Sequence, residues 1–90
     1  MITLKSSHEI EAMRRAGKIT AAARAVAREM VKPGVTTQQI DQAVYRFIKS
    51  QGAIPSFLNY NGYPASVCVS VNDEIIHGIP GKRVLQEGDI

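Results

Sequence analysis

The 90-residue sequence predicts an α/β (α+β) fold in which two helices are followed by antiparallel strands. Up to Gly52, apolar residues recur every three or four positions, as on one face of a helix. After Gly52 the chain is rich in β-branched residues, glycine, proline and asparagine, and the helical period is lost. A chain this short buries only about 60% of its unfolded surface. We therefore expect one domain or part of one, of marginal stability alone.

The first helix is predicted over residues 6–31. Ser6 and Glu9 form a capping-box signature, in which each side chain accepts a hydrogen bond from the backbone N–H of the other residue. An alanine-rich stripe on one face is expected to pack against another element, and it comprises Met13, Ala16, Thr20, Ala23, Ala27 and Met30. Pro33 and Gly34 end this helix, because proline cannot continue it and glycine tolerates the exit conformation.

The second helix begins after Thr36, which repeats the capping pattern with Gln39. Its predicted buried face consists of Ile40, Val44, Phe47 and Ile48, and Gly52 is its natural end. Both helices are interpreted as scaffold.

A hairpin is predicted over residues 65–77. Val67, Val69 and Val71 alternate with Ser66, Cys68 and Ser70, so the valines form the core face. Asn72 and Asp73 suit a two-residue turn, which places Val69 opposite Ile76 and Cys68 opposite His77. A three-residue loop would instead turn His77 into the core, opposite Val69. The shorter loop is preferred because it keeps Val69 and Ile76 together inside.

Composition excludes several functional classes. The net charge of +3 is spread along the chain without a basic block, which argues against a nucleic-acid-binding protein. No apolar run approaches the roughly 20 residues of a membrane span. Cys68 is the single cysteine, so no internal disulfide can form. A cytoplasmic location is the default expectation.

Three groups of side chains could carry chemistry. His77 lies on the polar face of the predicted hairpin, as a reactive group or as a structural histidine. Cys68 beside it could be a thiolate nucleophile or an inert small hydrophobe, and no third orienting group is evident. The aromatic residues of the preceding loop either cap the helices or line a pocket for an apolar group, and they are Phe57, Tyr60 and Tyr63.

A metal site is not expected within these residues. The two histidines, His8 and His77, are far apart, and no H-x-x-x-H pair occurs. We expect His8 to be solvated in the first helical turn. The remaining acidic candidates are interpreted as turn residues, namely Asp73, Glu74, Glu87 and Asp89.

Several segments resemble type I methionine aminopeptidases. They are NYNGYPASVC (59–68), SVNDE (70–74), HGIP (77–80) and GDI (88–90), together with EIEAMRRAG (9–17) and VKPGVTT (31–37). The resemblance covers essentially the whole chain in order. It implies the pita-bread fold, two related halves around an antiparallel sheet that holds two divalent metal ions (Co, Mn, Fe or Zn). Residues 1–90 would form the N-terminal portion of a single catalytic domain.

The resemblance also implies an activity and a site. Such enzymes remove the initiator methionine from new polypeptides whose second residue is small, so the partners would be those polypeptides and the ribosome, with no membrane or specific nucleic acid. His77 matches the histidine that contacts substrate and helps to stabilise the tetrahedral intermediate. Asn72 matches a residue near a monovalent cation. The methionine pocket would be lined by Phe57, Tyr60, Tyr63 and Cys68. Family members often have a smaller residue at the position of Phe57.

The ligands of the family's metals, two aspartates, one histidine and two glutamates, lie beyond the Gly-Asp-Ile element. We therefore expect this chain to bind no catalytic metal and to lack peptidase activity alone, with an unpaired sheet edge where it stops. The alternatives are a non-catalytic module that binds peptides or the ribosome, and a structural fragment that dimerises through the exposed edge.

Overall fold

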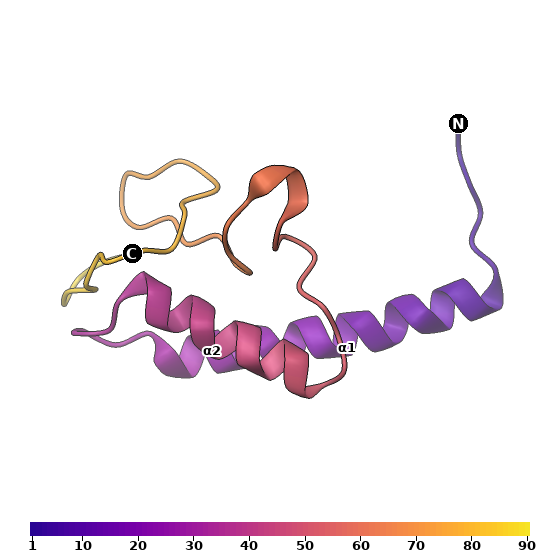
Figure 1. The fold of residues 1–90 in the computed structure, drawn as a ribbon, viewed down its shortest axis with the longest axis horizontal. Coiled ribbons are helices and arrows are strands. Elements are labelled where there is room, and N and C mark those ends of the chain that lie inside the picture. Colours follow the sequence, from indigo (N-terminus) through magenta and orange to yellow (C-terminus); the bar gives the residue numbers. More distant parts are fainter.

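The computed structural model describes residues 1–90, which form two antiparallel helices with loops laid over one of them. The helices are α1 (Ser7–Met30) and α2 (Thr37–Ser50), and a short 3-10 turn, η1, spans Tyr60–Gly62. The chain after α2 turns back and lies along the side of α2, while the first half of α1 extends beyond the rest (Figure 1). Neither helix is apolar over a length that would cross a membrane.

Both predicted helices are confirmed, and both begin with the predicted capping box. The Ser6 N–H donates to Glu9 Oε1 at 3.0 Å, and the Glu9 N–H donates to Ser6 Oγ at 3.2 Å. Thr36 and Gln39 repeat the exchange at 2.8 and 3.1 Å. Each box binds backbone N–H groups that the first helical turn leaves without an intrahelical partner. The helix starts are therefore local properties of a few neighbouring residues.

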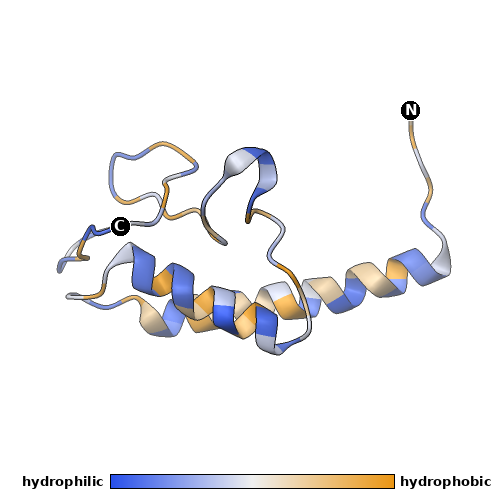
Figure 2. Cartoon of the chain, viewed as in Figure 1, coloured by the Kyte–Doolittle hydropathy of each residue, from blue (hydrophilic) through white to orange (hydrophobic).

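The apolar stripe of α1 is buried only along its second half. At 1.5 Å per residue α1 is about 36 Å long and α2 about 21 Å, so α2 cannot cover all of α1. Ala23 is buried and Ala27 and Met30 are half-buried, whereas Met13 remains 57% exposed. Apolar positions continue along the protruding half of α1 (Figure 2). The expectation that the whole stripe packs was wrong for Met13, Ala16 and Thr20.

The core lies where α2 meets the loops. Ile40 of α2 packs with Val71 and Leu85, which come from two different loops. Half-buried residues surround this cluster, namely Ala27, Met30, Val35 and Val69. The predicted inner face of α2 is confirmed, since Ile40 and Val44 are buried and Phe47 and Ile48 half-buried.

Residues 81–85 run along the turn between the helices and are tied to it through the backbone. The Gly34 N–H donates to the Leu85 carbonyl and the Leu85 N–H to the Val35 carbonyl, each at 2.8 Å. Thr36 and Val84 form an isolated antiparallel bridge. Thr37 Oγ1 also accepts from the Gly81 N–H at 2.8 Å. These bonds anchor the C-terminal segment on the N-terminus of α2.

The predicted antiparallel strands are not formed. The turn itself is present, because the Glu74 N–H donates to the Val71 carbonyl at 3.1 Å and Asn72 has a φ of 58°. Beyond the turn, however, the Val69 N–H donates to the Gly78 carbonyl at 2.8 Å, two residues later than the predicted partner Ile76. Neither predicted loop length gives this pairing.

The extra residues form a bulge that points into solvent. Ile75 and Ile76 are 85% and 74% exposed, so Ile76 does not share the inside with Val69. His77 has a φ of 62°, which an extended strand cannot contain. Val71 is buried against Ile40 and Leu85 without help from Ile76, which removes the reason for the predicted register. The exposed sheet edge of the expected dimerising fragment is likewise not confirmed, and dimerisation through it stays a prediction.

Candidate functional site

The five residues expected to contact substrate line one groove of about 490 Å³. They are Phe57, Tyr60, Tyr63, Cys68 and His77, and the rest of the lining is Asn61, Gly62, Pro64 and Ile79. A second hollow of about 540 Å³ lies between this loop and the two helices. Phe57, Cys68 and His77 line both spaces. The three side chains therefore stand in the wall that separates them.

The aromatic side of the groove is shaped by a tight loop around η1. Asn59 and Asn61 adopt left-handed backbone conformations, with φ of 65° and 48°. Asparagine is among the residues that tolerate this region best. The Asn59 N–H donates to the Tyr63 carbonyl at 2.8 Å and the Tyr60 N–H to the Phe57 carbonyl at 3.0 Å. The loop is thereby closed on itself, and its three rings reach the same groove.

Tyr63 is the best-anchored of these rings. It meets Phe57 edge to face, with ring centroids 6.1 Å apart and an interplanar angle of 69°. Its hydroxyl lies 2.9 Å from the Val67 carbonyl oxygen and 3.3 Å from that of Gly78, so it donates between the two. Burial, followed by a hydrogen bond with the Cys68 thiol, raises the pKa of Tyr63 to about 12. Tyr63 is consequently a neutral donor at physiological pH.

Two of the three rings, Tyr60 and Phe57, are too exposed to cap the helices. Tyr60 remains 68% exposed and Phe57 50% exposed, whereas a cap would bury both. Of the two interpretations of the aromatic cluster, the structure favours the groove.

His77 occupies the wall of the groove with a strained backbone. For residues other than glycine, asparagine and aspartate, a left-handed conformation costs about 1–3 kcal/mol and persists only where the surroundings impose it. The following residue, Gly78, indicates how the conformation of His77 is imposed. Its backbone lies so close to Val69 that a Cβ atom on Gly78 would overlap the Val69 carbonyl. Only glycine fits this approach. The backbone at Gly78 is therefore pressed against Val69, with His77 held beside it.

Cys68 lies half-buried in the same wall, close enough to line the groove with His77. No carboxylate lines this groove, so no acidic side chain is placed to orient a Cys–His pair. The thiolate interpretation gains no support from this geometry. A polarisable wall residue is the simpler role.

Asp41 is a structural residue of the site that the sequence did not reveal. Its Oδ1 accepts hydrogen bonds from the backbone N–H groups of Ser66 at 2.7 Å and Val67 at 3.0 Å. Both belong to the segment between Tyr63 and Cys68. A single carboxylate on α2 thus fixes the loop that carries one wall of the groove. This role could not be predicted from the sequence, because an isolated acidic residue on a helix has no distinguishing pattern.

Asn72 lies outside the groove and joins two segments. Its Nδ2 donates to Asp89 Oδ1 and its Oδ1 accepts from the Ile90 N–H, both at 3.0 Å. The Asn72 hydrogen bond, together with one from the Gln86 backbone, lowers the pKa of Asp89. Both polar atoms of the amide are therefore engaged within the chain. The position of Asn72 near a monovalent cation stays a prediction.

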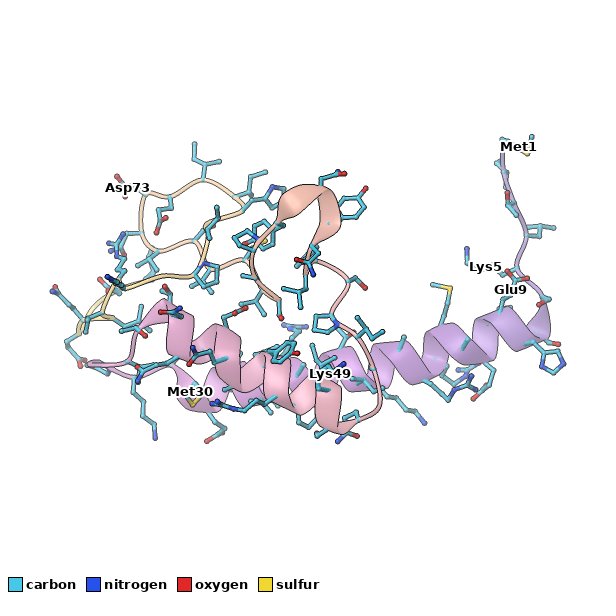
Figure 3. All side chains as sticks on the ribbon, viewed as in Figure 1. Met1, Lys5, Glu9, Met30, Lys49 and Asp73 are labelled. Atoms are coloured by element: carbon cyan, nitrogen blue, oxygen red, sulfur yellow. The ribbon has the colours of Figure 1, made fainter.

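The residues of this chain do not fit a metal centre by themselves. No group of three or more histidine, cysteine, aspartate or glutamate side chains is close enough to hold an ion. His8 is exposed in the first turn of α1, next to Glu9, while Asp73 points away from the tip of the 71–74 turn (Figure 3). The acidic and imidazole groups are thus dispersed over the molecule.

Known proteins share both the sequence and the geometry of this chain. The profile of metallopeptidase family M24 matches residues 11–90. The chain is 53% identical over 90 residues to methionine aminopeptidase 1 of Bacillus subtilis and 54% identical over 91 residues to a methionine aminopeptidase of Clostridium acetobutylicum. In each case it is matched along its entire length and spans 36% of the relative.

Solved structures agree with this similarity. The chain superposes on methionine aminopeptidase from Thermotoga maritima with a TM-score of 0.95 at 41% identity, and on that from Rickettsia prowazekii with 0.94 at 40%. In both cases 99% of this chain and 36% of the solved chain are covered. The helix pair and its loops correspond to part of the pita-bread fold of those enzymes, and the chain belongs to metallopeptidase family M24.

Proposed function

We propose that this chain supplies the methionine-binding side of an aminopeptidase that removes the initiator methionine from new polypeptides with a small second residue. The observation that carries the proposal is the convergence of Phe57, Tyr60, Tyr63, Cys68 and His77 on one groove. The relatives named methionine aminopeptidase support the substrate class. The same proposal includes the ribosome as a partner and a cytoplasmic location, because new polypeptides are made on ribosomes in the cytoplasm.

The chemistry of the groove suits a methionine side chain. Its volume of about 490 Å³ lies within the usual range of small-ligand sites, about 300–1,000 Å³. A thioether is apolar and polarisable, and each sulfur–aromatic contact contributes about 0.3–1.5 kcal/mol. The edge-to-face pair of Phe57 and Tyr63 offers such contacts, and the Tyr63 hydroxyl is already engaged by backbone carbonyls. The groove therefore favours an apolar side chain over a charged one.

His77 is the proposed catalytic residue. From the groove wall its ring N–H would donate to the oxygen of the scissile peptide as that oxygen becomes an oxyanion. A donor used mainly in the transition state raises turnover more than it strengthens substrate binding. The close approach of the Gly78 backbone to Val69 supports this role, because it fixes the main chain from which the His77 side chain extends and so limits reorganisation during the reaction.

A divalent metal ion, Co, Mn, Fe or Zn, would supply an activated water in the complete enzyme. This chain contains no ligand set for it, so the metal-binding residues would come from the remainder of the protein. The 90-residue chain alone is then expected to bind methionyl peptides through the groove without cleaving them.

Titration of the chain with a methionyl peptide tests the proposal. In a two-dimensional NMR experiment we expect shifts at groove residues and none in the protruding half of α1. Tyr60→Ala should weaken binding about tenfold, as for loss of one aromatic contact. Tyr45→Ala, an exposed tyrosine of α2 outside the groove, is the matched control. Shifts spread evenly over the surface, or equal losses in the two variants, would contradict a specific groove.

In the complete enzyme, His77→Ala is expected to lower kcat by about 100-fold or more while KM changes little, as for other oxyanion donors. Cys68→Ser should retain most of the activity. Unchanged turnover in the His77 variant would remove its catalytic role. Complete inactivity of the Cys68 variant would revive the thiolate nucleophile, and normal binding without turnover in the complete protein would favour the non-catalytic module.

A further inference from the structure

His77 stands apart from the other residues with positive φ. The rest are glycines or asparagines, which tolerate this region with little strain. His77 also lines both the groove and the second hollow. Its backbone conformation therefore determines where the imidazole enters the wall between them.

The following residue, Gly78, is bound through both of its backbone groups. Its N–H donates to Ser70 Oγ at 3.0 Å, and its carbonyl accepts from the Val69 N–H at 2.8 Å. The Tyr63 hydroxyl lies 3.3 Å from the same carbonyl oxygen. Two neighbouring residues of one segment thus hold Gly78 from both sides, immediately after the strained position.

Three residues bond to Gly78, namely Ser70, Val69 and Tyr63. Of these, Ser70 alone lies outside both the core and the groove lining. Its side chain is exposed, and its hydroxyl accepts from a backbone N–H eight positions away. Without that hydroxyl the Gly78 N–H would turn to solvent, and the strain at His77 would lose one of the bonds that oppose it. The Val69 bond would remain, so the surrounding core would persist.

We propose that Ser70 is a positioning residue for His77. Its hydroxyl fixes the Gly78 amide, and this bond keeps the His77 backbone left-handed and the imidazole in the groove wall. The conformational effect stands on the geometry alone, whereas its consequence for catalysis rests on the proposed function of His77.

Three variants of the 90-residue chain test the conformational effect by NMR. Ser70→Ala is expected to accelerate hydrogen exchange of the Gly78 amide about tenfold, the size expected for one lost hydrogen bond, and to move the His77 Cα and ring resonances. Ser70→Thr keeps a hydroxyl and should restore both readouts. Ser50→Ala is the matched control, because Ser50 is another exposed serine with one side-chain bond to the backbone, to the Phe47 carbonyl.

The exchange rates of the Ile40 and Val44 amides report whether the core itself has loosened, and they should not change in any variant. Unaltered Gly78 exchange and His77 resonances in Ser70→Ala would overturn the proposal. So would a Ser70→Thr protein that behaves like Ser70→Ala, because the hydroxyl would then not be the cause.

Kinetics of the complete enzyme separate this proposal from the function of His77. Ser70→Ala is expected to lower kcat about tenfold with KM within about twofold, and Ser70→Thr to recover most of the loss. If the His77 resonances move but kcat does not, the positioning by Ser70 stands and the catalytic role of His77 fails.

Discussion

The helical region, residues 7–50, and the loop region, residues 53–90, are held by different kinds of bond. In the helices the bonds are local, and the two capping boxes each span three residues. In the loops the bonds reach far along the chain, 25 residues from Asp41 to Ser66 and 44 from Thr37 to Gly81. The loop region nevertheless buries five residues, Pro55, Ala65, Ser66, Val71 and Leu85.

This difference makes the dependence between the regions one-sided. The loops take their shape from side chains that α2 presents, whereas the backbone bonds of each helix lie within that helix, apart from those of the Thr37 and Gln38 N–H groups to the loop. Disruption of the loops should therefore leave the helices largely intact. Removal of an α2 side chain that bonds to the loops should destabilise the loops and leave the helices in place. The variants below test this one-sidedness.

Gly78→Ala is expected to have the largest effect, about 3 kcal/mol of unfolding free energy, because the new Cβ would overlap the Val69 carbonyl. Amide protection of residues 65–80 should be lost while helical circular dichroism is largely kept. Gly81→Ala is the control, since a Cβ there meets nothing closer than 4.0 Å. Equal destabilisation by both variants would argue against the close approach.

Asp41→Ala should cost about 2 kcal/mol, because it leaves the Ser66 and Val67 N–H groups without their charged acceptor. Hydrogen exchange should increase at these two amides, and the affinity for a methionyl peptide should fall. Asp41→Asn keeps an acceptor and should lose less than half as much. If chemical denaturation found both variants as stable as the parent, the loop would be held by other bonds.

Ser6→Ala removes one cap and should cost about 1 kcal/mol, the usual value for a serine at this position. Fraying should be confined to the first turns of α1, which project beyond α2 and are exposed to solvent. Amide exchange measured residue by residue would show this, and any change in the groove amides would contradict the separation of the two regions.

The last prediction concerns alkaline pH, because no effect is expected near neutrality. Because the pKa of Tyr63 is raised to about 12, the folded state favours the neutral phenol more than the unfolded state does. This contribution is complete below the ordinary value near 10 and is lost as pH rises towards 12. An absorbance titration of tyrosinate should show one late-titrating group, absent in Tyr63→Phe. Simultaneous titration of all the tyrosines would contradict the partly buried, hydrogen-bonded hydroxyl.

The parts of the molecule that were predicted correctly depend on near neighbours in the chain. The helices over 7–30 and 37–50 follow from their capping residues and apolar spacing, and the turn at Asn72 and Asp73 follows from residues that accept a left-handed backbone. The five groove residues were singled out as candidates from the sequence itself, and the resemblance to methionine aminopeptidases added their assignment to a methionine pocket. The structure brings them together, and their roles stay predictions.

The register after that turn was predicted wrongly because alternation of valines specifies a face but not a partner. Tertiary packing selected Gly78 rather than Ile76 as the partner of Val69, since Gly78 alone permits the close backbone approach and Val71 was already buried by Ile40 and Leu85. Tertiary packing also determined the role of Asp41, because its hydrogen bonds to Ser66 and Val67 join residues that are far apart in the sequence. Local sequence specifies what forms through bonds between near neighbours, whereas contacts between distant residues exist only once the chain has folded around α2.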